Sequence, residues 1–155
     1  MFDITNLSLA PFSFYSKDQL EKVFSLDVSF FPLPWGKEAW SSCSDNGNLL
    51  SLLLLDQEIS GFILYCLLPD LTAHLLKILV LPELRGQNYA EKLFKESLEK
   101  LRELKARSIY LEVAQGNTRA CRFYDKNHFQ KLHLKKGYYS NGENAWSMAL
   151  ELLPF

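Results

Sequence analysis

The sequence has few cysteines, almost no net charge and no long apolar run, and each absence excludes a class of protein. Its 155 residues include three cysteines, Cys43, Cys66 and Cys121, which are odd in number and widely spaced. This pattern fits neither a disulfide framework nor a zinc cluster, so we expect reduced thiols and no metal site. A formal charge of -1 gives no electrostatic reason to bind nucleic acid or an anionic membrane.

The apolar runs, such as residues 52–55 and 62–68, are far too short to span a bilayer. The N-terminus has an early acidic residue, Asp3, and no basic start followed by a long apolar core, so we expect no secretory signal. The sequence therefore indicates a cytoplasmic protein without membrane or nucleic-acid partners. Its length fits one domain over residues 1–155, and no repeat or linker interrupts it.

Turn residues and apolar periodicity predict seven strands and about four helices. We expect strands at residues 7–15, 49–55, 59–67, 72–80, 108–113, 129–136 and 145–152. The first helix follows a capping box of Ser16 and Gln19, turns Leu20, Val23, Phe24 and position 27 or 28 to the core, and ends before Pro32 and Pro34. Further helices are predicted from Lys37, over 90–104, and over 118–127 with Asn117 as its N-cap. The predicted fold is α+β, with a mixed, mostly antiparallel sheet that has parallel neighbours beside residues 77–94.

Residues 77–94 organise this pattern. An apolar strand stops at Pro82, a short polar loop follows, and an amphipathic helix begins near Ala90. Backbone amides at such a helix N-terminus are a ready site for a phosphate. An ordinary strand-to-helix turn has the same local pattern.

Residues further along resemble a known family. They are Leu111-Glu112-Val113, Asn117, Ala120, Phe123-Tyr124, His128-Phe129, Gly137-Tyr138-Tyr139 and Met148-Ala149-Leu150, together with the earlier Leu33-Pro34-Trp35. This set resembles the GNAT superfamily of N-acetyltransferases and, within it, the bacterial ribosomal-protein-alanine N-acetyltransferases. The resemblance covers nearly the whole chain. It implies the GNAT fold and transfer of acetyl from acetyl-CoA to an amine.

The resemblance also implies which residues hold acetyl-CoA. The pyrophosphate would be bound by Arg85, Gly86, Gln87, Asn88, Tyr89, Ala90 and Glu91, the pantetheine arm by the backbone of Ile78, Leu79 and Val80, and a further part by Asn117. Asn88 stands where the family usually has glycine. Asparagine tolerates positive φ better than other non-glycine residues, so we expect the loop to keep its shape at a modest cost. Asn117 is equally well explained as a helix cap.

Two residues match the family's proton-transfer groups. Glu112 matches the general base, and because it lies in an apolar strand we expect burial to raise its pKa. Tyr124 matches the general acid that protonates the leaving thiolate. From the residues alone, Glu112 is also compatible with a solvent-facing strand position, and Tyr124 with a packed core aromatic.

The acceptor is predicted to be a protein N-terminus. An α-amine titrates at about 8 and a lysine at about 10.4, so far more of the α-amine is free base at neutral pH. We expect Pro34, Trp35, Tyr138 and Tyr139 to line a groove for an extended peptide, although the two tyrosines are also typical of a hairpin pair. The resemblance implies a small-subunit ribosomal protein that begins with alanine. A small amine, a lysine side chain, or a non-catalytic acyl-CoA-binding role stays open.

Overall fold

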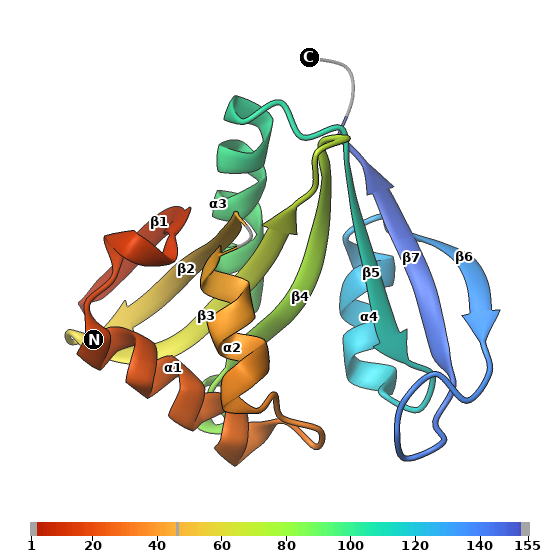
Figure 1. Cartoon of the computed structure of the whole chain (residues 1–155), viewed down its shortest axis with the longest axis horizontal. Helices are drawn as coiled ribbons and strands as arrows, with labels where there is room; N and C mark the ends of the chain where they lie inside the picture. The colour runs from red at the N-terminus through yellow and green to blue at the C-terminus, as the bar shows by residue number, and fades with distance from the viewer. Residues whose placement is uncertain (1–2, 46, 153–155) are drawn as a thin grey trace.

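A mixed sheet runs through the molecule in the computed structural model, which describes residues 3–45 and 47–152 (Figure 1). Its seven strands have the order β1-β2-β3-β4-β5-β7-β6. They are β1 (Ile4–Pro11), β2 (Asn48–Leu55), β3 (Glu58–Leu67), β4 (Thr72–Val80), β5 (Ser108–Ala114), β6 (Gln130–Lys135) and β7 (Ala145–Glu151). Every neighbouring pair described is antiparallel except β4 and β5, which confirms the predicted mixed sheet.

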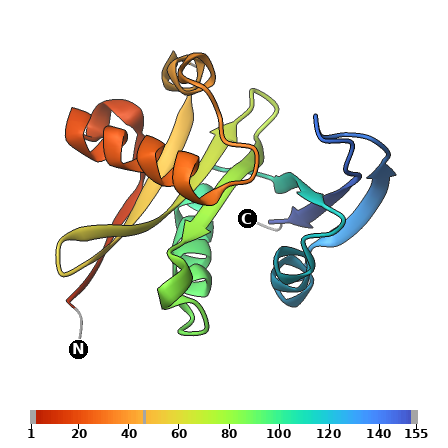
Figure 2. The ribbon, with the colours of Figure 1, turned by 90° about the horizontal axis from the view of Figure 1, so that it is seen from below.

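Two pairs of helices cover the sheet. Figure 2 shows α1 (Lys17–Phe30) and α2 (Lys37–Asp45) on one side, and α3 (Tyr89–Glu103) and α4 (Thr118–Lys126) on the other. The first pair packs on β2, β3 and β4, through residues such as Val23, Trp40 and Phe62. The second pair packs on the opposite face, through residues such as Phe94 and Leu111. Among the described residues, the cluster under α1 and α2 includes none from β5, β6 or β7.

The helix starts follow the sequence closely. Ser16 and Gln19 form the predicted capping box at the start of α1. Asn117 accepts a hydrogen bond from the Ala120 backbone N–H, as predicted for the cap of α4. Helix α1 ends just before Phe31 and the two prolines, because Pro32 disfavours helical geometry in the residue before it.

The predicted first strand was wrong in its bounds. Strand β1 is Ile4–Pro11, and a 3₁₀ helix, Phe12–Phe14, follows it. The alternation in residues 7–15 extends past the strand because Tyr15, which follows the 3₁₀ helix, is also buried; its hydroxyl donates to the Ser8 carbonyl. The predicted turn at residues 45–48 includes Asn46, which lies outside the described residues, and its Gly47 has a φ of 67°.

Strands β4 and β5 pair over a short distance and then separate (Figure 1). Their parallel register ends at His74 and Tyr110. Leu64 of β3 pairs with Lys77 and its neighbour Tyr65 with Leu75, so Leu76 is an extra residue in β4. Such a bulge bends a strand and increases its twist. Within the described chain, the separation leaves one edge of the later part of β4 without a neighbouring strand.

Candidate active site

A cleft of about 810 Å³ lies where β4 and β5 separate. Most of the predicted site residues line it: Trp35, Ile78, Leu79, Val80, Arg85, Gly86, Asn88, Tyr89, Ala90, Glu91, Glu112, Asn117, Tyr124 and Tyr139. Gln87, Pro34 and Tyr138 are not among the described residues that line it. The fold therefore brings together residues from β4, the start of α3, β5, α4 and four connecting loops.

The loop before α3 has the backbone expected for an anion site. Gly86 and Asn88 have φ values of 80° and 64°, so Asn88 adopts the left-handed conformation that we expected it to tolerate. Its side chain makes no capping hydrogen bond to the described residues of α3, which begins at Tyr89. The N–H groups of the first helical turn thus lack a side-chain acceptor from Asn88, and with the helix dipole they favour a negatively charged group.

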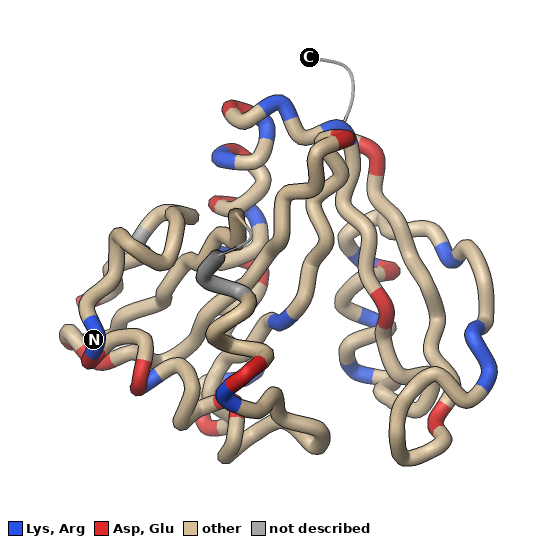
Figure 3. The backbone as a smooth tube through the Cα atoms, in the orientation of Figure 1, with Lys and Arg blue, Asp and Glu red and all other residues tan. Residues whose placement is uncertain are grey.

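Basic side chains add to this end of the cleft. Arg85, Arg119 and Lys126 all line it, and Figure 3 shows basic residues along α4. Burial and the nearby Arg119 lower the pKa of Arg85, as expected for two cations placed close together. Arg119 and Lys126 were not predicted as site residues. For Arg119, the sequence did contain a signal: it lies two residues after the cap Asn117, at the start of a helix that faces the cleft.

Asn117 and Glu91 each have a structural contact as well. Asn117 caps α4 and also lines the cleft, so its two interpretations are compatible. The Glu91 carboxylate accepts from Asn127 Nδ2 at 2.9 Å and lies 3.4 Å from Lys126 Nζ. It therefore links the start of α3 to the end of α4.

Glu112 lies in a network of hydrogen-bond donors. His74 Nε2 lies 2.8 Å from its Oε1, and Lys135 Nζ lies 3.3 Å from its Oε2. Lys135 also donates to the Tyr110 hydroxyl at 2.8 Å, and Tyr110 hydrogen-bonds to Glu112 in turn. The Glu112 side chain is only 9% exposed, so its charge is stabilised mainly by these groups.

The prediction of a raised pKa at Glu112 was wrong. Burial does act to raise it, but the hydrogen bonds from His74, Tyr110 and Lys135 and the charge of His74 outweigh burial and lower the pKa to about 2. Glu112 is therefore a carboxylate at neutral pH and a weak proton acceptor by itself.

His74 and Lys135 were not predicted as part of the site. They reach Glu112 from β4 and β6, and the register that pairs His74 with Tyr110 depends on the parallel contact between β4 and β5. No local spacing in the sequence indicates that contact. The sequence shows basic residues within 131–136, but it does not indicate which of them points toward Glu112.

Tyr124 is both a core aromatic and a cleft residue. Its ring packs edge-on against Phe123 and Phe129, with centroid distances of 5.5 and 5.3 Å. Burial, with Tyr139 and Cys121 nearby, raises its pKa. The hydroxyl therefore keeps its proton at neutral pH, as a proton donor must.

Aromatic residues form two sides of the outer cleft. Phe31 and Trp35 line it between α1 and α2, and Tyr139 lines it between β6 and β7. Tyr138 packs edge-on against Tyr139 at 4.9 Å and is exposed, so the hairpin-pair interpretation describes their mutual contact. Burial and the neighbouring Tyr138 and Glu112 raise the pKa of Tyr139 to about 12.

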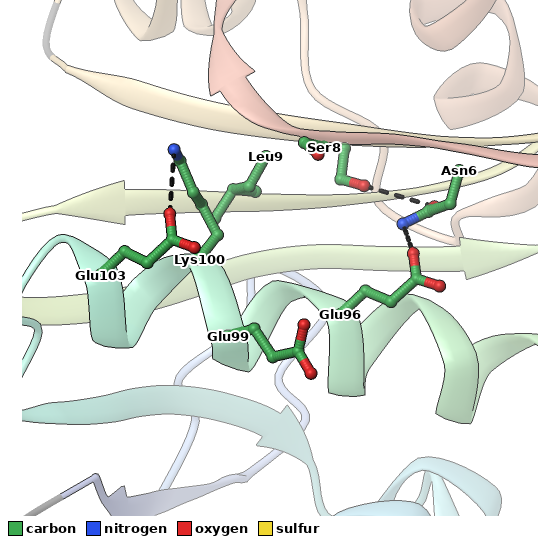
Figure 4. Close-up of a pocket in the computed structure, with 8 residues that line it drawn as sticks. Asn6, Ser8, Leu9, Glu96, Glu99, Lys100 and Glu103 are labelled. Atoms are coloured by element: carbon green, nitrogen blue, oxygen red, sulfur yellow. Dashed lines mark hydrogen bonds and ion pairs between the residues drawn. The ribbon is translucent and has the colours of Figure 1, made fainter.

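A second cavity, of about 350 Å³, lies between β1 and α3 (Figure 4). Two polar pairs lie along it: Asn6 donates to Glu96, and Lys100 Nζ lies 3.4 Å from Glu103 Oε2. None of its described lining residues also lines the cleft at β4 and β5.

Within residues 3–45 and 47–152, no group of three or more His, Cys, Asp or Glu side chains is arranged to hold a metal ion. In that same part of the chain no helix is long and apolar enough to cross a membrane. Among the described residues, Cys66 and Cys121 are in no disulfide, and burial raises the pKa of both thiols.

The chain is similar to known acetyltransferases in sequence and in fold. Residues 13–129 match the model of the acetyltransferase (GNAT) family. The chain is 29% identical over 142 residues to the ribosomal protein bS18-alanine N-acetyltransferase of Haemophilus ducreyi, covering 88% of this chain and 96% of the relative. It is 39% identical over 88 residues to an N-alpha-acetyltransferase of Saccharolobus solfataricus, over 55% of this chain and 53% of that protein. The fold resembles the ribosomal-protein-S18-alanine N-acetyltransferase of Escherichia coli, with a TM-score of 0.83 and 22% identity over 100% and 96% of the two chains.

Proposed function

The chain belongs to the acetyltransferase (GNAT) family, and from this premise we propose that it transfers acetyl from acetyl-CoA to the N-terminal α-amine of a protein. The amine attacks directly in a ternary complex, and no acetyl-enzyme forms. The observation that carries the proposal is one cleft lined by an anion-binding helix start, a carboxylate network and a buried tyrosine. We further propose that residues 1–155 act as one catalytic domain in the cytoplasm.

Acetyl-CoA supplies an activated thioester and a thiolate leaving group. Its pyrophosphate would lie against the first turn of α3, near Arg85 and Arg119, where amides, dipole and charge all favour an anion. The backbone of Ile78, Leu79 and Val80 would pair with the pantetheine arm, since β5 does not pair with that part of β4. Arg85, Gly86, Gln87, Asn88, Tyr89, Ala90, Glu91 and Asn117 stay the proposed holders of the nucleotide end.

The proton of the attacking amine would pass to the pair formed by Glu112 and His74. A carboxylate with a pKa of about 2 holds a proton poorly at neutral pH, so Glu112 would accept the proton only in passing, directly or through water, with the His74 ring 2.8 Å from its Oε1. Tyr124 would protonate the leaving thiolate from its buried hydroxyl. Phe31, Trp35 and Tyr139 would form the walls for the incoming peptide, with Pro34 and Tyr138 supporting them.

Two observations support an α-amine as acceptor. The free-base fraction of an α-amine at neutral pH is roughly a few hundred times that of a lysine, which suits a site without a strong base. The relative from H. ducreyi is named as a ribosomal protein bS18-alanine N-acetyltransferase, and it matches most of this chain. We therefore propose a ribosomal protein of the small subunit that begins with alanine.

Two peptides test this function. One begins with a free alanine and contains no lysine, and the other has a blocked N-terminus and one internal lysine. We expect the protein with acetyl-CoA to modify the first and leave the second unchanged, and Glu112→Gln to slow the reaction by about a hundredfold or more. Modification of the lysine peptide alone would refute the proposed acceptor. Tight acetyl-CoA binding without reaction of any amine would instead favour a binding role.

A further inference from the structure

A buried ion pair lies behind the aromatic wall of the cleft. Asp27 of α1 is 0% exposed and Lys77 of β4 is 5% exposed, and Lys77 Nζ lies 2.6 Å from Asp27 Oδ1. Lys77 also lines the cleft itself. A charge pair this deeply buried loses much hydration, so its other contacts decide what it does.

The second oxygen of Asp27 holds the loop between α1 and α2. Asp27 Oδ2 accepts from the Trp35 backbone N–H and from Trp40 Nε1, both at 2.9 Å. Pro32 and Pro34 have no backbone N–H, so the Trp35 amide is one of few donors with which this loop can be held. One carboxylate thus connects β4, the loop and α2.

The same loop surrounds the ammonium of Lys77. Its Nζ lies 4.4 Å from the centroid of Phe31, 4.7 Å from Trp35 and 6.0 Å from Trp40. A cation over aromatic rings attracts them, more strongly where water is excluded. Phe31 and Trp35, which pack on this ammonium, are also cleft-lining residues.

We infer that Asp27 and Lys77 are positioning residues that fix Phe31 and Trp35 against β4, and so set the acceptor wall before the acceptor binds. This inference rests on the proposed function, because it concerns the acceptor side of the same cleft. Neither residue is needed for the phosphate end, which is formed by α3 and α4. Loss of the pair should therefore weaken acceptor binding and leave acetyl-CoA binding intact.

The test uses Asp27→Asn and the double variant Asp27→Asn/Lys77→Gln. In the single variant the side-chain oxygen of the amide accepts from both tryptophan donors. Its NH₂ group then faces the Lys77 ammonium, and these two hydrogen-bond donors repel each other. In the double variant the side-chain carbonyl of the introduced glutamine accepts from that NH₂, so a neutral pair replaces the ionic one. Lys17→Gln, which breaks the exposed pair with Glu21 on α1, is the control.

We expect Asp27→Asn to raise the KM of the alanine peptide by roughly tenfold while the Kd of acetyl-CoA, from calorimetry, changes less than about twofold. The double variant should bring the peptide KM back to within about threefold of the wild type. Equal losses in both affinities, or an unchanged peptide KM in folded Asp27→Asn, would overturn the inference. A folded double variant beside an unfolded single variant supports it, and failure of both to fold overturns it in favour of a role in folding alone.

Tryptophan emission separates this inference from the proposed function. In a Trp146→Phe background the remaining tryptophans are Trp35 and Trp40. We expect a red shift in Asp27→Asn that is reversed in the double variant, whether or not a peptide is the acceptor. Unchanged emission in the single variant would count against the inference. If the red shift and its reversal are observed but no peptide is acetylated, the result counts against the proposed function only.

Discussion

Replacing Glu112 with glutamine tests the network that surrounds it. Glutamine keeps the size of the side chain but has no charge to stabilise, so His74 and Lys135 lose an anionic partner. The wild type carries a carboxylate whose pKa is lowered from 4.5 to about 2 by these contacts, against the opposing effect of burial. The variant therefore removes one specific contribution to the dependence of stability on pH.

The size of this contribution follows from the lowered pKa. The pKa difference of 2.5 (4.5 minus 2) corresponds to about 3.4 kcal/mol before solvent screening is taken into account. His74 and Lys135 are 28% and 38% exposed, so solvent screening reduces the contribution to about 1–2 kcal/mol. Because the folded pKa lies below the unfolded one, the stabilisation is present above pH 4.5 and is lost as the pH falls toward 2.

Urea unfolding followed by circular dichroism at pH 6 and pH 3 measures this contribution. We expect the difference in unfolding free energy between the wild type and Glu112→Gln to shrink by about 1 kcal/mol from pH 6 to pH 3. Glu21→Gln, on the exposed side of α1, controls for the loss of a carboxylate at the surface. A difference that stays constant between the two pH values would refute the network.

Three further predictions address the other parts of the site and the sheet beneath it. Tyr124→Phe should lower kcat by about a hundredfold with acetyl-CoA affinity unchanged, because the ring packing is kept and the proton donor is lost; an unchanged kcat would refute its assigned role. Asn88→Gly should leave acetyl-CoA affinity unchanged or tighten it in calorimetry, because it relieves a φ of 64°, whereas a large loss would show that the side chain contacts the ligand. Gly61→Ala should lower the unfolding free energy by about 1–3 kcal/mol, because its Cβ would lie 2.6 Å from the Leu79 carbonyl oxygen; unchanged urea unfolding would contradict this.

Sequence periodicity predicted the elements well where one face is strongly apolar. The helix α3 begins within a residue of its predicted start, and the strands β2 to β5 lie within a residue of their predicted bounds. Periodicity also put position 27 or 28 of α1 toward the core, and the structure buries Asp27 and exposes Val28. It did not predict the partner of Asp27, because that partner comes from a strand fifty residues later.

The candidate site was predictable in its parts but not in its electrostatics. The resemblance picked out Glu112 and Tyr124, and the cleft does bring both beside the start of α3. The low pKa of Glu112 depends on His74 and Lys135, whose approach is set by strand order and register. Burial was therefore predicted from the strand pattern, while two of the three donors that outweigh it, His74 and Lys135, come from other strands.

The central claim is that this cleft joins acetyl-CoA to a protein α-amine. A single peptide that carries both a free N-terminal alanine and an internal lysine tests it most directly. After incubation with the protein and acetyl-CoA, tandem mass spectrometry locates the added acetyl group. We expect one acetyl group on the α-amine and none on the lysine; acetylation at the lysine in preference to the N-terminus would contradict the claim.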